Sequence, residues 1–191
     1  MSDIATTVGP VGDLNEYAQI SIRFQVSRVL TPVLENSGLG GIVFREEAVE
    51  PSYKKDYDAS EPPSTWAERW DLSNWGMIVA ASEGQPVGGC IVAYDTAGVD
   101  MLEGRRDLSV LWDIRIAPNF RGRGIGADIF QRAVHWSRER RCTAMKIETQ
   151  NNNVGACRFY VRQGCVLRTI SRFAYIEFPE EVQLVWHKEI P

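Results

Sequence analysis

Apolar and polar side chains alternate over residues 20–26, which is the period of a half-buried β-strand. A long first strand is therefore expected at this point. Glycines at 38–41 mark a turn, and residues 42–44 are expected to form a short partner strand. The acidic stretch that follows, to about Ser64, is predicted to be a loop with helical pieces.

A β-hairpin is predicted in the middle of the chain. Residues 75–81 and 87–94 are apolar runs, and Ser82–Pro86 between them contains the glycine and proline that are typical of a tight reversal. Residues 110–116 form another strand-like run. That strand is expected to end before Pro118, because proline cannot donate an N–H to a neighbouring strand.

The last third of the chain alternates strands and helices. Residues 126–140 carry apolar or small side chains at the 3.6-residue period, with Asp128 in the first turn and arginines in the last, which suits the helix dipole. The further elements expected are a strand at 144–149, a helix capped by Asn152 or Asn153 that runs to Gln163, and strands at 165–170 and 182–186. This order predicts a mixed α/β sheet.

Length and composition favour one globular domain. The chain has 191 residues, of which 44% are hydrophobic and 24% charged. Residues 1–12 are small and polar and are expected to form a flexible tail, with residues 13–191 as a single domain. No apolar stretch reaches the roughly 18 residues of a membrane span, and the first residues do not resemble an export signal. A cytoplasmic protein is therefore expected.

The cysteines and histidines do not indicate a metal site. There are four cysteines and two histidines, with no Cys-x-x-Cys pair. The cysteines fall in or beside strand-like or helical apolar runs, so we expect buried, reduced thiols, which suits a reducing compartment.

Charge is distributed unevenly along the chain. The formal net charge is −4, which argues against nucleic acid as a partner. Residues 46–61 contain six acids and two lysines, whereas residues 115–141 contain seven arginines and two acids. These segments are either two solvated faces or two binding regions, an anionic ligand at the basic end and a cationic one at the acidic end.

A glycine-rich loop precedes the predicted helix at 126–140. Residues 121–126 follow the pattern Arg-x-x-Gly-x-Gly, in which glycines allow close backbone approach and the first helical turn offers unpaired N–H groups. These donors, with Arg121 and Arg123, suit a pyrophosphate. The alternative is a tight strand-to-helix connection. A P-loop is excluded because Gly126 is followed by Ala127 and Asp128, and the preceding antiparallel strands argue against a dinucleotide-binding fold.

Two motifs resemble those of the GNAT superfamily of N-acetyltransferases. Leu111–Gly126 resembles its acetyl-CoA motif, and Asn153–Ala156, continuing to Tyr160 and Gly164, resembles the helix motif that follows. Further segments resemble streptothricin acetyltransferases: Glu148–Tyr160, Phe173–Tyr175, Val185–Trp186 and Pro51–Asp58. Cys165 departs from the family, where an aromatic residue is common. The resemblance implies an α/β (α+β), GNAT-like fold with a mixed, mostly antiparallel central sheet flanked by helices, and acetyl-CoA as donor.

The resemblance also implies a donor site. Backbone groups of the strand before the loop would bind pantetheine, the loop would bind the pyrophosphate, and the second motif would bind the CoA arm. The residues so assigned are Ile114, Arg115, Ile116, Arg121, Gly122, Arg123, Gly124, Ile125, Gly126, Asn152, Asn153, Ala156 and Tyr160. Asn153 is equally expected as a helix cap, and Asn152 could take either role.

Amine acetylation sets two requirements on the protein. An amine with a pKa of about 10.4 is neutral in only about one molecule in 2,500 at pH 7, so a base is expected. Asp113 and Glu148 are the two candidates, and each could instead form an ordinary ion pair, with Arg115 or Lys146. Tyr160 resembles the family tyrosine that protonates the departing thiolate, although it could also be a core aromatic.

The acceptor is assigned by resemblance alone. The acidic segment with Trp70, Trp75, Trp112 and Tyr175 could hold a small cationic molecule such as streptothricin, whose acetylation confers antibiotic resistance, although each aromatic could also be core. The alternatives are a protein lysine or N-terminal acetyltransferase and a non-catalytic acyl-CoA-binding regulator. A homodimer is expected by analogy with the family.

Overall fold

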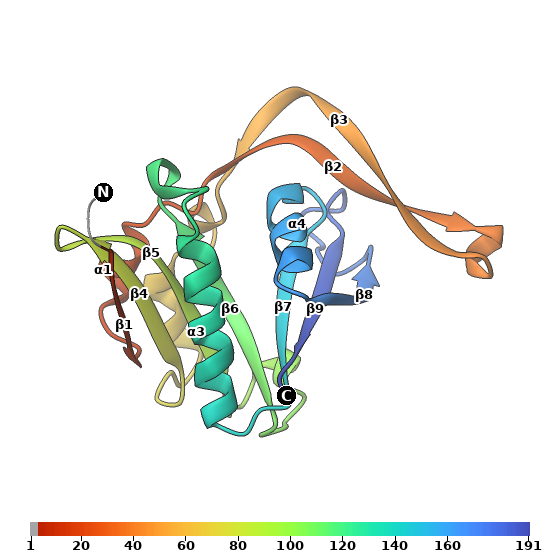
Figure 1. The fold of residues 1–191 in the computed structure, drawn as a ribbon. Coiled ribbons are helices and arrows are strands. Elements are labelled where there is room, and N and C mark those ends of the chain that lie inside the picture. The colour runs from red at the N-terminus through yellow and green to blue at the C-terminus, as the bar shows by residue number, and fades with distance from the viewer. Residues whose placement is uncertain (1–3) are drawn as a thin grey trace. The chain divides into compact units, whose positions relative to one another are not determined.

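The computed structural model describes residues 4–191 and combines a seven-stranded sheet with a separate two-stranded one (Figure 1). The strand order in the larger sheet is β1-β4-β5-β6-β7-β9-β8, and the smaller sheet pairs β2 with β3. The chain divides into two compact units. Unit 1 comprises the N-terminal segment to Ile22, Asp56–Ile147 and His187–Pro191, and unit 2 comprises Arg23–Lys55 and Glu148–Trp186.

The strands are β1 (Ile4–Pro10), β2 (Phe24–Glu35), β3 (Gly41–Lys55), β4 (Gly76–Ser82), β5 (Gln85–Tyr94), β6 (Leu108–Ile116), β7 (Ala144–Gln150), β8 (Val166–Ser171) and β9 (Gln183–Glu189). The α-helices are α1 (Leu14–Ala18), α2 (Trp66–Arg69), α3 (Ile125–Glu139) and α4 (Val154–Arg162). Short 3₁₀ turns lie at η1 (Asn36–Gly38), η2 (Tyr57–Ala59), η3 (Pro63–Thr65), η4 (Asp100–Leu102) and η5 (Pro118–Phe120).

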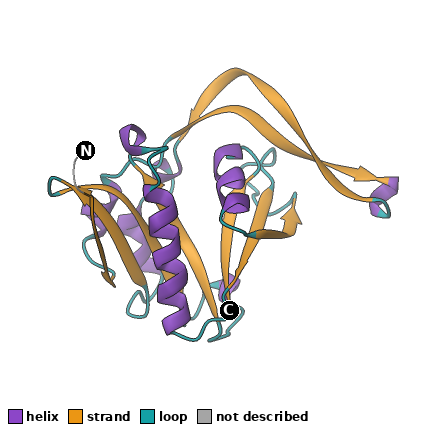
Figure 2. Ribbon diagram, in the orientation of Figure 1, coloured by secondary structure: helices purple, strands orange, loops and turns teal. Residues whose placement is uncertain are grey.

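Unit 1 carries helices on both faces of its strands (Figure 2). Neighbouring residues of a strand point to opposite faces, and two adjacent glycines of β5 show which helix covers each face. A Cβ at Gly88 would lie 3.1 Å from Ile129 of α3, whereas a Cβ at Gly89 would lie 2.8 Å from the ring of Tyr17 of α1. The α3 side is filled by Ile129, Phe130 and other buried apolar residues of that helix, as its 3.6-residue period predicted.

The predicted middle and last thirds of the chain agree with the structure. The hairpin turns at Glu83 and Gly84, both with positive φ, so that Ser82 pairs directly with Gln85. The helix predicted at 126–140 is α3, and the one predicted to run to Gln163 is α4, which is capped by Asn153 and followed by Gly164 at φ 74°. All four cysteines are buried and unpaired in disulfides.

The N-terminal third differs from the sequence expectations in three places. Residues 4–10 of the expected tail form β1, an edge strand that pairs along its whole length with β4; residues 1–3 lie outside the described part of the chain. The long first strand begins at Phe24, after the unforeseen helix α1. The short partner at 42–44 is instead the 15-residue strand β3, which takes in most of the expected acidic loop because residues 41–48 and 53–55 pair with β2. The single-domain organisation stays a prediction.

Candidate functional site

The glycine-rich loop leads into an uncapped helix. Gly122 and Gly124 have φ values of 75° and 84°, and a Cβ at either would meet no atom within 4 Å, so the backbone conformation rather than space favours glycine there. Side chains of Asp13 and Asn153 accept hydrogen bonds from first-turn amides of α1 and α4. Gly124 offers α3 no such cap. The first turn of the longest helix therefore presents donors and about half a positive charge.

Two exposed arginines flank this helix end. The Nε atom of Arg121 donates to the carbonyl oxygen of Ile116 at 2.9 Å, and the Arg123 guanidinium lies 5.1 Å from the ring centre of Phe120. Further along α3, Arg132 pairs with Asp128 at 2.8 Å, which neutralises that part of the basic segment. Arg121 and Arg123 thus bring positive charge to the loop, and a second basic group, Arg138, Arg140 and Arg141, lies at the other end of the helix.

Strand β6, which precedes the glycine-rich loop, changes its pairing partners halfway along its length. Within unit 1, β6 pairs with β7 only over Leu108–Leu111, whereas its pairing with β5 continues to Ile116. The register with β5 shifts at Trp112, which marks a β-bulge. Ile114 and Ile116 therefore lie on a stretch of β6 whose β7-side edge has no ladder partner within unit 1. Backbone groups on such an edge can bind an amide-containing ligand.

Arg115 lies in the same stretch, but its guanidinium is fully hydrogen-bonded to other residues of the chain. Its side chain is buried, and its guanidinium bonds both oxygens of Asp113 at 2.8 Å and both oxygens of Asp58 at 2.8 and 3.1 Å. It also donates to the carbonyl of Ile20 at 3.2 Å. Burial opposes its charge, but these acceptors outweigh burial and raise the pKa of Arg115. This side chain anchors η2 and the α1 region to β6.

Tyr17 completes the network around Asp113. Its hydroxyl donates to Asp113 Oδ1, and its ring lies against Gly89, where any larger residue would collide with it. Burial, followed by the nearby charge of Asp113, raises the pKa of Tyr17, which keeps the hydroxyl protonated as a donor. Asp113 thus accepts from a buried guanidinium and a buried phenol. Protonating it would leave that guanidinium with one counter-charge fewer, so Asp113 is poorly suited to act as a base.

Glu148, the other candidate base, belongs to unit 2 and has neutral partners. Tyr175 donates to its Oε1 at 2.7 Å, and Gln183 donates to its Oε2 at 2.8 Å. Gln150 in turn donates from Nε2 to the Tyr175 hydroxyl at 2.8 Å. Glu148 is half-buried and takes part in no ion pair within residues 4–191, and the expected partner Lys146 pairs with Glu103 instead. Both carboxylate oxygens of Glu148 are therefore oriented by hydrogen bonds, while none of the described cations pairs with its negative charge.

The remaining predicted residues of unit 2 lie on α4 or just before it. Asn153 caps the helix, with its Oδ1 accepting from the amide of Ala156 at 3.1 Å, and Asn152 is buried. Tyr160 is also buried, and its ring centre lies 6.3 Å from that of Trp186 and 5.5 Å from that of Phe159. Asn153 is therefore the helix cap, one of the two roles expected from the sequence. The cap uses only its Oδ1 and not its side-chain nitrogen.

The aromatic residues expected in the acceptor pocket are divided between the two units. Trp70, Trp75 and Trp112 pack together in the core of unit 1, with ring centres 4.7–6.3 Å apart, whereas Tyr175 belongs to unit 2. The acids of residues 46–61 also have internal partners. Glu46 pairs with Arg28 and Arg158, Asp58 with Arg115, and Glu61 with Arg69. Three of the six acids of that segment therefore already have a cationic partner.

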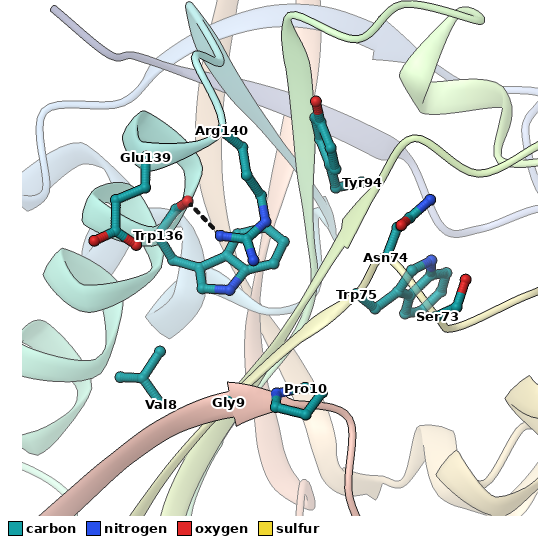
Figure 3. Close-up of a pocket in the computed structure, with 10 residues that line it drawn as sticks. All are labelled: Val8, Gly9, Pro10, Ser73, Asn74, Trp75, Tyr94, Trp136, Glu139 and Arg140. Carbon is teal, nitrogen blue, oxygen red and sulfur yellow. Dashed lines mark hydrogen bonds between the residues drawn. The ribbon is translucent and has the colours of Figure 1, made fainter.

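A cavity of about 370 Å³ lies at the other end of α3 (Figure 3). Trp136 and Arg140 of the last helical turns line it together with Tyr94 and Trp75. The Arg140 guanidinium lies over the Trp136 ring at 3.5 Å and donates to the Trp136 carbonyl. The 15 residues of α3 separate this cavity from the glycine loop by about 20 Å. Of the predicted site residues, only Trp75 of the expected acceptor pocket lines it.

The sequence did not identify three residues that orient the candidate carboxylates. Tyr17 and Asp58 hold Asp113 and Arg115, and Gln183 holds Glu148. The first two lie in the poorly patterned N-terminal third. A local signal existed only for the helix that carries Tyr17, since Asp13 followed by Glu16 is a typical capping pair.

No metal site and no membrane-spanning helix emerge from residues 4–191. There, no group of three or more histidine, cysteine, aspartate or glutamate side chains is arranged to hold a metal ion. None of the helices described is long and apolar enough to cross a membrane.

Comparisons with known proteins agree on one family. The sequence model described as the acetyltransferase (GNAT) family matches residues 44–165. Streptothricin acetyltransferase A of Bacillus subtilis (strain 168) is 23% identical over 166 residues, which cover 86% of this chain and 87% of that protein.

Two solved structures share the fold over nearly the whole chain. One is nourseothricin acetyltransferase, with a TM-score of 0.75 and 22% identity. The other is a protein of Bacillus anthracis str. Ames in complex with acetyl coenzyme A, with a TM-score of 0.76 and 24% identity. Each match covers 98% of this chain and 99% of the other. The GNAT-like α/β fold with a mostly antiparallel sheet, predicted from the motifs, is confirmed.

Proposed function

The chain belongs to the GNAT acetyltransferase family, and from this premise we propose that it acetylates a primary amine of a small cationic acceptor of the streptothricin class. As a member of that family it is an acetyl-CoA-dependent N-acetyltransferase. The observation that carries the acceptor proposal is the match, along most of both chains, to streptothricin acetyltransferase A. Acetylation would remove a positive charge from such a molecule and with it part of its affinity for an anionic target, giving antibiotic resistance in the cytoplasm.

The donor site of this proposal is built on the loop and β6. The first-turn amides of α3, with Arg121 and Arg123, would bind the pyrophosphate of acetyl-CoA. The fit rests on the missing side-chain cap at Gly124 and on the positive φ of Gly122 and Gly124. The backbone of Ile114 and Ile116 would bind the pantetheine amides. The guanidinium of Arg115 is buried against Asp58 and Asp113, so Arg115 would contribute to the donor site through its backbone alone.

Glu148 is the base of the proposed reaction. Its carboxylate accepts a proton from the acceptor ammonium, directly or through water, and the freed nitrogen lone pair attacks the thioester carbonyl. The C–N bond forms and the nitrogen loses its second proton to solvent, while the C–S bond breaks and the CoA thiolate leaves with the electron pair. Tyr175 and Gln183 orient the two carboxylate oxygens before the reaction, so less reorganisation is needed during proton transfer.

Tyr160 is the proposed acid. Its hydroxyl would donate a proton to the leaving thiolate. A thiol has a pKa of about 8.5 and is a tolerable leaving group unaided, so the contribution of Tyr160 is expected to be modest. The amide nitrogen of Asn153, whose Oδ1 is used in the helix cap, would bind the CoA arm.

The experiment that tests the function measures CoA release with a thiol reagent in the purified full chain. Streptothricin, free lysine, spermidine and a lysine-containing peptide are offered in parallel, and Glu148→Gln serves as the control for enzyme-dependent transfer. Turnover that depends on streptothricin and is much slower with the other amines supports the proposal. Preference for the peptide would instead identify a protein acetyltransferase.

A binding measurement separates the donor site from the acceptor. Isothermal titration with acetyl-CoA is expected to show binding that Gly124→Val weakens at least about tenfold, because a β-branched residue is strained at positive φ. Gly104→Val, at a positive-φ glycine outside the loop, is the matched control. Tight acetyl-CoA binding without turnover on any amine would favour a non-catalytic regulator and overturn the enzymatic proposal.

A further inference from the structure

The cavity at the C-terminal end of α3 lies within unit 1, away from the glycine loop (Figure 3). Val8 and Pro10 of β1 line it together with Trp136 and Arg140 from the end of α3. Its volume of about 370 Å³ is within the range of small-molecule sites. Because the length of α3 separates it from the proposed donor site, the proposed acetyl transfer does not use this cavity.

Trp136 brings an unused hydrogen-bond donor to this cavity. The residue is only 4% exposed, and its indole is fixed against β4, where a Cβ at Gly76 would lie 2.4 Å from the ring. Within residues 4–191, its Nε1 donates to no acceptor. The Nε1 of Trp186 also lacks an acceptor but is sealed from solvent, whereas that of Trp136 is accessible and lies on the edge of the ring that faces β1 (Figure 3). Because a buried indole N–H usually has a partner, this donor indicates a ligand.

Arg140 adds a positive charge beside that donor. Its guanidinium lies 3.5 Å from the centre of the Trp136 ring and gives one N–H to the Trp136 carbonyl at 3.1 Å. A guanidinium carries several more N–H donors, and those of Arg140 have no acceptor within residues 4–191. The acid that lines the cavity, Glu139, is exposed and lies 3.3 Å from His135, and its carboxylate points away from Arg140 (Figure 3). The cavity therefore offers hydrogen-bond donors and positive charge, which suit an anion.

The aromatic part of the lining suits a flat, apolar body. The ring of Tyr94 lies edge-on to that of Trp136, with their centres 6.3 Å apart and their planes at 86°. Trp75 contributes an apolar surface, because its Nε1 already donates to the Thr96 hydroxyl at 2.8 Å. An aromatic ring packs favourably against such side chains. The cavity therefore combines an anion-binding end with an aromatic wall.

We propose that this cavity binds a small carboxylate with a flat, apolar body, such as benzoate. The carboxylate accepts hydrogen bonds from Arg140 and from Nε1 of Trp136, and the ring lies against Tyr94 and Trp75. One arginine balances the single charge of a carboxylate, and its planar guanidinium matches the two oxygens. Such a ligand is opposite in charge to the amine acceptor of the proposed reaction, and its binding does not depend on acetyl transfer.

The test follows the indole N–H signals of the full chain by proton–nitrogen correlation spectroscopy during titration with benzoate. The Trp136 signal is identified as the one that Trp136→Phe lacks. Benzoate is expected to shift this signal saturably, with a dissociation constant of about 10 mM or below for a ligand of this size. Benzamide has the same shape without the charge and should bind at least about tenfold more weakly. Saturating acetyl-CoA should leave benzoate binding unchanged, because α3 separates the two sites.

Two arginine variants distinguish this site from a general effect of charge. Arg140→Gln removes the charge from the cavity and is expected to weaken benzoate binding at least about tenfold, with little effect on benzamide. Arg138→Gln makes the same change at an exposed position of α3 that does not line the cavity, so it should bind benzoate as the wild-type chain does. Circular dichroism checks that both variants are folded, and the benzamide comparison needs no variant.

Three results would each overturn the proposal. The first is the absence of a saturable shift of the Trp136 signal up to about 50 mM benzoate. The second is equal affinity of the wild-type chain for benzoate and benzamide. The third is an unchanged affinity for benzoate in folded Arg140→Gln.

Discussion

The two candidate carboxylates have opposite surroundings, although each accepts hydrogen bonds at both oxygens. Asp113 of unit 1 faces the buried guanidinium of Arg115, which Asp58 shares, and the buried hydroxyl of Tyr17. Glu148 of unit 2 is held by the neutral groups of Tyr175 and Gln183. A carboxylate that balances a buried cation stabilises the fold and is costly to protonate. A carboxylate oriented by neutral donors is able to accept a proton and return it. The difference supports the proposed division of roles, in which Asp113 is structural and Glu148 is the base.

The largest effect is expected from Glu148→Gln. Removal of a general base typically costs 10²–10⁴-fold in rate, so kcat should fall by about that factor when the variant is assayed at pH 7. The thermal midpoint should change little, because glutamine keeps the size and one acceptor for Tyr175. Gln183→Glu is the matched comparison, since it adds a charge beside the same carboxylate without removing it. Wild-type kcat in Glu148→Gln would refute the division of roles.

Asp113→Asn should affect stability instead. It leaves the buried Arg115 with Asp58 alone, and a broken buried ion pair costs about 3 kcal/mol in the free energy of unfolding. Urea denaturation measures this loss. Asp128→Asn removes one partner of an exposed pair and should leave the midpoint unchanged. If folded Asp113→Asn also loses kcat by a hundredfold or more, Asp113 takes part in the chemistry after all.

Local signals were sufficient to predict the elements from residue 75 onward. The hairpin at Ser82–Gln85, the 3.6-residue period of α3 and the Asn153 cap of α4 each depend on a few neighbouring residues. The full length of the β2–β3 ribbon and the strand β1 were not predicted, because they are specified by long-range pairing. Pro10 and the small residues before it looked like a tail, yet an edge strand tolerates proline at its end.

The candidate site was likewise predictable only where it depends on residues that are neighbours in the sequence. The glycine loop was predictable because it is one continuous motif, and the resemblance to the family followed from it. The roles of the two carboxylates were not predictable, because they depend on residues that are distant in the sequence. Asp58 lies 57 positions from Arg115, and Tyr17 lies 96 positions from Asp113. Spacing alone allowed Lys146 to pair with Glu148, whereas the structure pairs it with Glu103.

Tyr160→Phe tests whether Tyr160, which like Glu148 belongs to unit 2, donates a proton to the leaving thiolate. Since the leaving thiol departs tolerably without help, kcat is expected to fall only about tenfold. The ring keeps its packing against Trp186, so the thermal midpoint should be nearly unchanged. Phe159→Leu, at the neighbouring and less buried position, is the control for packing. A full wild-type kcat in Tyr160→Phe would show that solvent rather than Tyr160 protonates the thiolate.

The smallest expected effect is on the alkylation of two cysteines, one beside each candidate carboxylate. Cys90 is buried next to the Asp113 network, where burial and then the charge of Asp113 raise the pKa of its thiol. Cys157 lies beside Gln150 of the Glu148 cluster, and burial raises its pKa to about 12. Only the thiolate is reactive, and a raised pKa lowers its fraction at pH 8, to about one in 10⁴ for Cys157.

Alkylation with N-ethylmaleimide at pH 8, followed by mass spectrometry of the peptides, should therefore leave both thiols unmodified in the native protein, whereas denaturant makes both react. The two variants should then differ. Asp113→Asn removes the charge next to Cys90 and loosens the network around it, so that Cys90 is labelled slowly. Glu148→Gln leaves the packing around Cys157 intact, so that this thiol stays protected. Equal labelling of both cysteines in both variants would mean that the two carboxylates stabilise their surroundings alike, and the contrast between them would then rest on kcat alone.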